Sequence, residues 1–155
     1  MHRRRPGRIH AGGGGLITGI WSKIALRGWG GARISDLHIV QESLTADSAQ
    51  LIAMFEIVSD IAGPAAIEVR CANDPAIGAD MRVALVPGTQ TAKIAFTIAK
   101  PRLWWCNGLG EAFLYELTGR LVTGHARDSR DARIGLRTVK IAQTPDADGA
   151  GFAIE

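Results

Sequence analysis

Two adjacent tryptophans mark the stretch of this sequence that most invites a chemical reading, PRLWWCNGLGEAFLYEL at residues 101–117. The chain has four Trp and one Tyr, so Trp104 and Trp105 concentrate much of its large aromatic surface. Such rings combine an apolar face with a polar edge. The pair is therefore compatible with a platform for stacking sugars, with a buried core, or with a contact to another domain. A sugar platform needs a further exposed aromatic ring or a polar cluster nearby, and Tyr115 is the only candidate.

Carboxylates in a pattern suited to hydrolysis are the next feature to consider. Cleavage of a glycosidic bond with retention needs two carboxyl groups about 5–5.5 Å apart, one of them held protonated. The acidic residues here are scattered over expected strands and turns. Glu56 and Glu116 can pair only if their strands are neighbours, and we expect both on solvated outer faces. No Ser lies in a local motif with His and an acid. The sequence thus predicts no catalytic residue.

Cofactor, metal and disulfide chemistry also finds little support. The AGGGG stretch at 11–15 lacks the third glycine and the lysine of phosphate-binding loops, so it favours a flexible lead-in. Cys71 and Cys106 are too few for a four-ligand zinc site. Cys71 shares an alternating face with Ile67 and Val69, which predicts a small buried hydrophobe. A bridge between the two cysteines stays open as the less favoured alternative, since the low count fits a reducing cytoplasm. We expect no cofactor and no metal.

The distribution of charge argues against nucleic acid and membrane partners. The formal net charge of +3 comes from the first eight residues, MHRRRPGR, which hold four arginines and no acid. The remainder carries 14 basic and 15 acidic residues. A nucleic-acid-binding or membrane-binding domain would show a basic stripe in its body. No apolar run approaches the roughly 18 residues of a membrane-spanning helix.

Hydrophobic periodicity is almost entirely of period two. Short β-rich runs are separated by turn-forming clusters such as TADS, PGTQ, NGLG and HARDSRD. We expect strands at 32–40, 49–58, 65–72, 81–86, 91–99, 112–123 and 132–142. About seven short strands at this spacing predict an all-β fold, an immunoglobulin-like antiparallel β-sandwich. In an extended 101–105 segment, alternation would send Trp105 into the core and Trp104 to the outer side.

One cation in the last expected strand is predicted to need a partner. In ARIGLRTVKI, Ile134 and Leu136 share one face, whereas Val139 and Ile141 share the other face with Arg137. Both faces cannot point to the core without a bulge near Arg137. We expect this arginine to be partly buried and held by a carboxylate, within the sandwich or on another domain. An exposed arginine on a two-sided strand is the alternative.

Several motifs together resemble a known enzyme family. GIW at 19–21, Trp29 followed by ARISDLHI, the LWWCNGLGE run, GLRTVKI at 135–141 and DGAGFAIE are similar, in that order, to the β-mannosidase branch of glycoside hydrolase family 2. The resemblance implies a chain that is a piece of a longer protein. It implies a lead-in at 1–15, the last strand of a jelly-roll domain at 16–30, an immunoglobulin-like sandwich at 31–143, and a linker at 144–155 towards a catalytic barrel that this chain lacks.

The resemblance also implies the role of particular residues and partners. Structural or interdomain roles are expected for Trp21, Trp29, Trp104, Trp105, Asn107, Gly108, Tyr115 and Arg137. The chain departs from the family where HAGGGG replaces an aromatic segment of the jelly roll, and where Cys106 replaces a proline. We therefore expect a non-catalytic domain of a hydrolase of terminal β-D-mannosides, contacting the jelly roll and barrel, with a possible homodimer through apolar residues 16–30 and 103–110. A free-standing carbohydrate-binding sandwich using Trp104 and Trp105 is the alternative, and an adhesion module is a third, weaker one.

Overall fold

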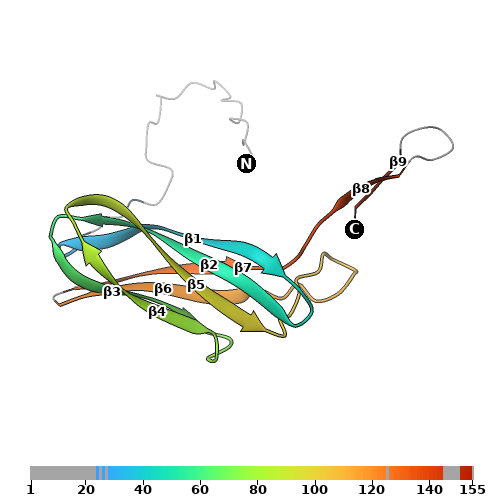
Figure 1. The fold of residues 1–155 in the computed structure, drawn as a ribbon, viewed down its shortest axis with the longest axis horizontal. Coiled ribbons are helices and arrows are strands. Elements are labelled where there is room, and N and C mark those ends of the chain that lie inside the picture. The colour runs from blue at the N-terminus through green and yellow to red at the C-terminus, as the bar shows by residue number, and fades with distance from the viewer. Residues whose placement is uncertain (1–23, 25, 27, 125, 145–150, 155) are drawn as a thin grey trace, which may run out of the picture.

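Seven antiparallel strands form two facing sheets in the computed structural model, which describes residues 24, 26, 28–124, 126–144 and 151–154 (Figure 1). One sheet has three strands in the order β1 (Ala32–Leu44), β2 (Ser48–Ser59) and β5 (Gly88–Ala99). The other has four strands in the order β4 (Gly78–Leu85), β3 (Gly63–Cys71), β6 (Tyr115–Thr123) and β7 (Arg127–Ile134). The predicted all-β sandwich of about seven strands is confirmed.

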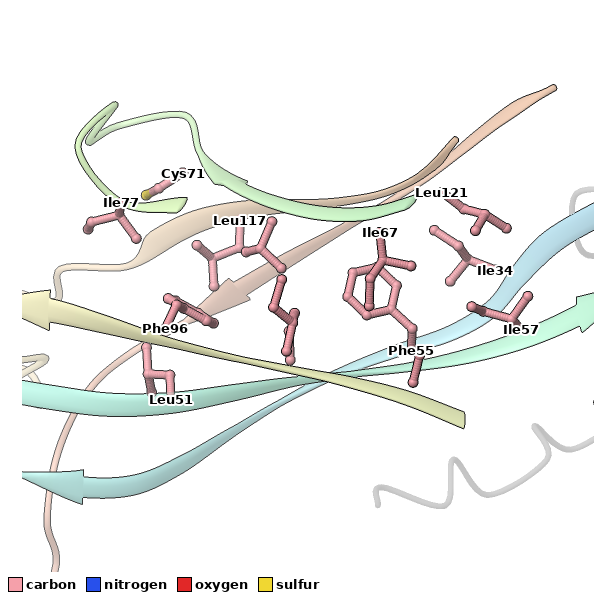
Figure 2. Packing of buried hydrophobic residues seen from close by; sticks show 14 of the residues in the cluster. Ile34, Leu51, Phe55, Ile57, Ile67, Cys71, Ile77, Phe96, Leu117 and Leu121 are labelled. Carbon is pink, nitrogen blue, oxygen red and sulfur yellow. The ribbon is translucent and has the colours of Figure 1, made fainter. Parts of the chain in front are cut away.

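The alternation of each strand explains why the two sheets must meet. Every second side chain of β2, β3, β5 and β6 is buried, whereas the residues between them are half-buried or exposed. Figure 2 shows these inner side chains pointing towards each other from the two sheets, with Phe55 and Ile67 near the middle. Burial of one apolar face per sheet is the main driving force for such a sandwich. Cys71 is part of this core at 5% exposure, as its alternating position predicts.

The strand order is that of an immunoglobulin-like sandwich with its fourth strand on the second sheet. If the strands are lettered A to G in chain order, the sheets read A-B-E and D-C-F-G. In the constant-type immunoglobulin domain the fourth strand instead pairs with the fifth. Here β4 pairs with β3 from Gly63 opposite Leu85 to Arg70 opposite Gly78. One edge of β5 is left without a neighbouring strand as a result.

Two expectations about the last part of the sandwich are wrong. The segment HARDSRD was expected to be a turn, but β7 begins at Arg127 and pairs with β6 as far as Ile134. The ladder of main-chain hydrogen bonds with β6 outweighs its turn-like composition. The single strand expected at 132–142 instead ends at Ile134, and the chain continues without strand structure to Ile141. The change of apolar parity therefore marks the end of a strand rather than a bulge within one.

Beyond the sandwich lies a short hairpin of β8 (Ile141–Thr144) and β9 (Gly151–Ile154), which projects away from the two sheets (Figure 1). The GFAIE stretch, which the resemblance placed in a linker, thus contributes β9. Before the sandwich, the described residues 24, 26 and 28–30 belong to no strand. The rest of the strand expected at 16–30, including Trp21, lies outside the described residues. The part of the chain described here has no helix of the length and apolarity needed to cross a membrane.

Candidate functional site

The tryptophan pair lies in a small hairpin between β5 and β6 rather than in a strand of the sandwich. The N–H of Trp105 donates to the carbonyl of Glu111 at 2.9 Å, and Trp104 forms an isolated bridge with Ala112. The carboxylate of Glu111 accepts two hydrogen bonds from Nη2 of Arg102, at 2.6 and 2.8 Å. Both charged side chains are more than half exposed, so this ion pair stabilises the hairpin only slightly. Sequence analysis did not single out the pair, although opposite charges flanking an Asn-Gly turn are a recognisable sign of it.

The tip of this hairpin is the turn expected at Asn107 and Gly108. The N–H of Leu109 donates to the carbonyl of Cys106 at 3.1 Å, which closes a four-residue turn. Gly108 has a φ of 85°, whereas Asn107 is not among the residues with positive φ. A positive φ at the third position alone defines a type II turn, where glycine is strongly preferred. The two residues thus fix the geometry of the hairpin tip.

Trp104 is held against the segment that follows β7. Its N–H donates to the carbonyl of Leu136 at 3.0 Å, and its side chain lies against Gly135. A Cβ atom built on Gly135 would be 2.7 Å from the Cβ of Trp104, closer than real Cβ contacts occur. Only glycine fits at position 135 of the GLRT motif, because a side chain there would displace Trp104.

Trp105 points towards Arg137, and its assignment to the core is wrong. The guanidinium carbon of Arg137 lies 4.2 Å from the centre of the Trp105 ring, in a cation–π contact. Both side chains are half-buried. The Trp104 side chain lies against Gly135, and residues 101–114 leave the sheet at the end of β5. Trp105 therefore covers the end of the sandwich instead of filling its interior.

The expected carboxylate partner of Arg137 is also not observed among the described residues. Besides the Trp105 ring, the guanidinium contacts the carbonyl of Trp104, with Nη1 at 3.5 Å, the long limit of a hydrogen bond. The side chain is partly buried, as expected. Among the described residues the Trp105 ring contacts this cation, and a carboxylate on another domain stays a prediction.

A hollow of about 510 Å³ opens beside this pair at one end of the sandwich. Its walls come from the turn after β1, from the segment after β5 and from the segment after β7, and comprise Leu44, Thr45, Ala46, Pro101, Leu103, Trp105, Arg137 and Thr138. Leu109 and Val139 lie nearby in sequence and are 65% and 62% exposed. This end therefore combines an apolar hollow with one half-buried cation.

Tyr115 is a structural residue of this end and is not available as a sugar-stacking ring. It is 3% exposed, and its hydroxyl accepts a hydrogen bond from the N–H of Arg102 at 2.8 Å. Its ring meets Phe113 edge to face, with 4.8 Å between centroids. A tyrosine at the start of the sixth strand that binds the main chain upstream is the tyrosine corner of immunoglobulin-like domains. The carbohydrate-binding alternative loses its third exposed aromatic.

Trp29 lies just before β1, near the opposite end of the sandwich. It is 48% exposed, and the guanidinium carbon of Arg33 lies 4.7 Å from its ring centre. Ile61 and Val86 are exposed in the turns at the same end. Each end of the sandwich thus has a tryptophan with an arginine stacked on it, beside exposed apolar side chains.

The two glutamates considered for catalysis lie on different sheets. Glu56 is on β2 and Glu116 is on β6, both are exposed, and both have buried neighbours on either side in sequence. Their side chains therefore leave opposite faces of the sandwich and cannot share a substrate. The expectation of solvated outer faces is confirmed. Cys71 and Cys106 are both free thiols, the former buried and the latter exposed.

The fold and these contacts define an immunoglobulin-like β-sandwich domain in which tryptophan and arginine pairs occupy both ends. Residues 32–137 match the family described as glycosyl hydrolases family 2. The chain belongs to this family.

Similar proteins cover the same region of much longer chains. Beta-mannosidase B of Aspergillus terreus is 30% identical over 140 residues, covering 88% of this chain and 16% of that protein. The Aspergillus fumigatus protein of the same name is 32% identical over 141 residues, with the same coverage. A crystal structure of beta-D-mannosidase from Dictyoglomus thermophilum matches with a TM-score of 0.75 and 29% identity, over 83% of this chain and 16% of that one. This chain thus spans about a sixth of the length of these relatives.

Proposed function

We propose that this chain is the non-catalytic immunoglobulin-like domain of a β-mannosidase-like glycoside hydrolase, and that the complete enzyme hydrolyses terminal β-D-mannosides. In this proposal residues 31–143 form the linking sandwich. Residues 16–30 supply the last strand of a preceding jelly-roll domain, after a lead-in at 1–15, and residues 144–155 lead to a catalytic barrel. The names of the relatives and the motif order support the enzyme class.

The distribution of exposed apolar side chains is the observation that carries the linking role. Among the described residues, the exposed large hydrophobic side chains lie in the segment before β1 and at the two ends of the sandwich. Only Met81 of this set lies within a strand. The set comprises Ile24, Leu26, Trp29, Ile61, Met81, Val86, Leu109, Leu114 and Val139. Apolar patches at the points where a chain enters and leaves a domain are typical of contacts with neighbouring domains.

The tryptophan and arginine pairs restrict side-chain motion at both ends of the sandwich, so that an adjoining domain would be held in one orientation. Arg137 and Trp105 stiffen the end that the chain leaves, and Arg33 stiffens Trp29 at the other end. Asn107 and Gly108 set the direction of the hairpin, and Tyr115 anchors its base to the core. Positioning a catalytic domain to within about an ångström matters for rate, so a linking domain needs rigid ends.

A domain exchange tests the proposal. Residues 31–143 would replace the matching segment of the Dictyoglomus thermophilum beta-D-mannosidase, and release of nitrophenol from an aryl β-mannoside would be measured. We expect an active hybrid enzyme and no hydrolysis by the isolated chain. A folded hybrid without activity, or activity of the isolated chain above the blank, would contradict the proposal.

Matched variants of the hybrid separate an interdomain role from a merely structural one. Leu109→Asp and Val139→Asp should lower the melting temperature of the hybrid but leave that of the isolated chain unchanged. Met81→Asp is the control, because Met81 is exposed but lies on β4, away from both ends. Titration of the isolated chain with mannose should give no saturable change in tryptophan fluorescence. A change that Trp104→Ala abolishes would favour the carbohydrate-binding alternative.

A further inference from the structure

The four strands at the sheet edges differ in how well their free main-chain groups are protected. The edges of the three-stranded sheet are β1 and β5, and those of the four-stranded sheet are β4 and β7. An edge strand offers unpaired N–H and C=O groups to any other strand, and proteins usually block it with bulges, charges or covering side chains. The edges of β1, β4 and β7 are protected in one of these ways, and the edge of β5 is not.

The edge of β1 is closed by side chains of β7. A carboxylate oxygen of Asp128 accepts a hydrogen bond from the N–H of Ile34 at 2.7 Å, and Nε of Arg130 donates to the carbonyl of Ile34 at 3.2 Å. The pairing of β1 with β2 also shifts register twice, between Ile34 and Asp36 and between Gln41 and Ser43. β7 itself has the sequence RDSRDARI, with charges at five of eight positions.

The edge of β4 is protected by the charged residues Asp80 and Arg82 on the strand and by a glutamine at its end. After the strand, Gln90 binds the carbonyl of Ala84 and the N–H of Val86 through its side chain. The strand is also short, with eight residues.

β5 is twelve residues long and pairs with β2 without any register shift. The N–H of Lys100 donates to the carbonyl of Asp47 at 2.8 Å, next to the pair formed by Ser48 and Ala99. Because hydrogen-bonded and non-hydrogen-bonded pairs alternate along an antiparallel ladder, the even-numbered residues of β5 bond to β2. The odd-numbered ones direct their N–H and C=O groups to the free edge, and from Thr91 to the end of the strand these are Thr91, Lys93, Ala95, Thr97 and Ala99.

These five residues form a regular edge without a β-bulge and with little charge. Their side chains are exposed on the outer face, and Lys93 is the only charged residue among them. No residue of the strand is proline. No described residue hydrogen-bonds to their main-chain groups.

We propose that the free edge of β5 binds the same edge of a second copy of this chain, antiparallel about a twofold axis at Ala95. In this register Thr91 lies opposite Ala99 and Lys93 lies opposite Thr97, so all five residues exchange main-chain hydrogen bonds. The two lysines are kept apart, and the cross-strand neighbours on the outer face are small. The result is a continuous six-stranded sheet across the dimer.

A second copy fits this edge better than an arbitrary strand does, because the edge is complementary to itself. A twofold contact uses the same surface on both partners, and here that surface offers donors and acceptors in equal number with no like charges opposed. Outside its first eight residues the chain has 14 basic and 15 acidic residues, so long-range repulsion between copies is weak. The contact lies on a sheet edge, away from the ends assigned to neighbouring domains.

The first test is the oligomeric state of the full chain, measured by light scattering over a range of concentrations. The wild-type chain should pass from one to two chains per particle as concentration rises. Ala95→Pro removes an N–H that points to the free edge without breaking the ladder to β2, so it should raise the dissociation constant more than about tenfold. Ala95→Thr keeps the N–H and suits a strand, so it should leave the dimer intact.

A cross-linking test fixes the register. In a Cys106→Ser background, Ala95→Cys places two thiols opposite each other across the twofold axis, and mild oxidation should give a disulfide-linked dimer. Gln50→Cys is the control, because Gln50 is exposed on the central strand β2 and should not cross-link. A wild-type chain that stays monomeric at millimolar concentration would overturn the proposal. So would a dimer that persists in Ala95→Pro, or amides of 91–99 that exchange slowly in a monomer, since another strand would then occupy the edge.

Discussion

The contact between Arg137 and Trp105 should show as a measurable coupling energy. The guanidinium carbon lies 4.2 Å from the ring centre, and both side chains are half-buried. Cation–π contacts contribute about 0.5–1 kcal/mol at exposed sites and about 2 kcal/mol when desolvated, so we expect a coupling of about 1 kcal/mol. Removing the ring with Trp105→Ala should cost about 1–3 kcal/mol, less than the 3–5 kcal/mol of a fully buried aromatic.

The assay is a double-mutant cycle in urea, followed by far-ultraviolet circular dichroism because two of the four proteins lack a tryptophan. The four proteins are the wild type, Arg137→Ala, Trp105→Ala and the double variant. A parallel cycle of Arg137→Ala with Trp29→Ala serves as the control, because Trp29 stacks with Arg33 near the other end of the sandwich. The control pair should be additive. Additivity within about 0.3 kcal/mol for Arg137 with Trp105 would refute the contact, and a cost of about 4 kcal/mol for Trp105→Ala would return that ring to the core.

Three further substitutions test the packing that supports both ends. Asp128→Ala leaves a buried main-chain N–H of β1 without its acceptor and should cost about 1.5–3 kcal/mol in urea unfolding, whereas Asp131→Ala, at an exposed neighbour of the same strand, should cost less than about 0.5 kcal/mol. Gly119→Ala should cost about 1–3 kcal/mol by overpacking, since a Cβ there would lie 2.8 Å from core side chains, while Gly124→Ala meets nothing within 4 Å and should change the melting temperature little. Tyr115→Phe removes the hydroxyl that binds the main chain of the hairpin and should lower stability by about 1 kcal/mol without changing the circular dichroism spectrum. Equal effects within either matched pair, or no effect at Tyr115, would contradict the contacts described.

Apolar alternation predicted most of the strands, because it records which face of each strand is buried. The runs at 49–58 and 91–99 lie within β2 and β5, and their inward residues are those of the core. Alternation failed at β7, where every exposed position and two of the inner ones are polar. That strand is held by main-chain pairing with β6 and by bonds from Asp128 and Arg130 to β1. Partners so far away in the sequence leave no local periodic signal.

The motifs indicated the family and the residues worth examining, but not their contacts. The Asn-Gly turn and the partial burial of Arg137 follow from local rules of turn geometry and alternation. The partner of Arg137 did not, because an arginine can be satisfied by a carboxylate or by an aromatic ring, and the choice depends on which segment packs beside it. Gly135 illustrates the same limit, since the side chain of Trp104 lies where a Cβ atom would be.

The sequence by itself determined the all-β class, the number of strands in the sandwich and the family motifs, because these depend on local periodicity and on residue identity. Tertiary structure alone decided that Trp105 covers the end of the sandwich, that its ring contacts Arg137, and that β4 joins β3 and leaves β5 with a free edge. Each of these depends on how segments far apart in sequence meet, and that is set by the packing of the two sheets as a whole.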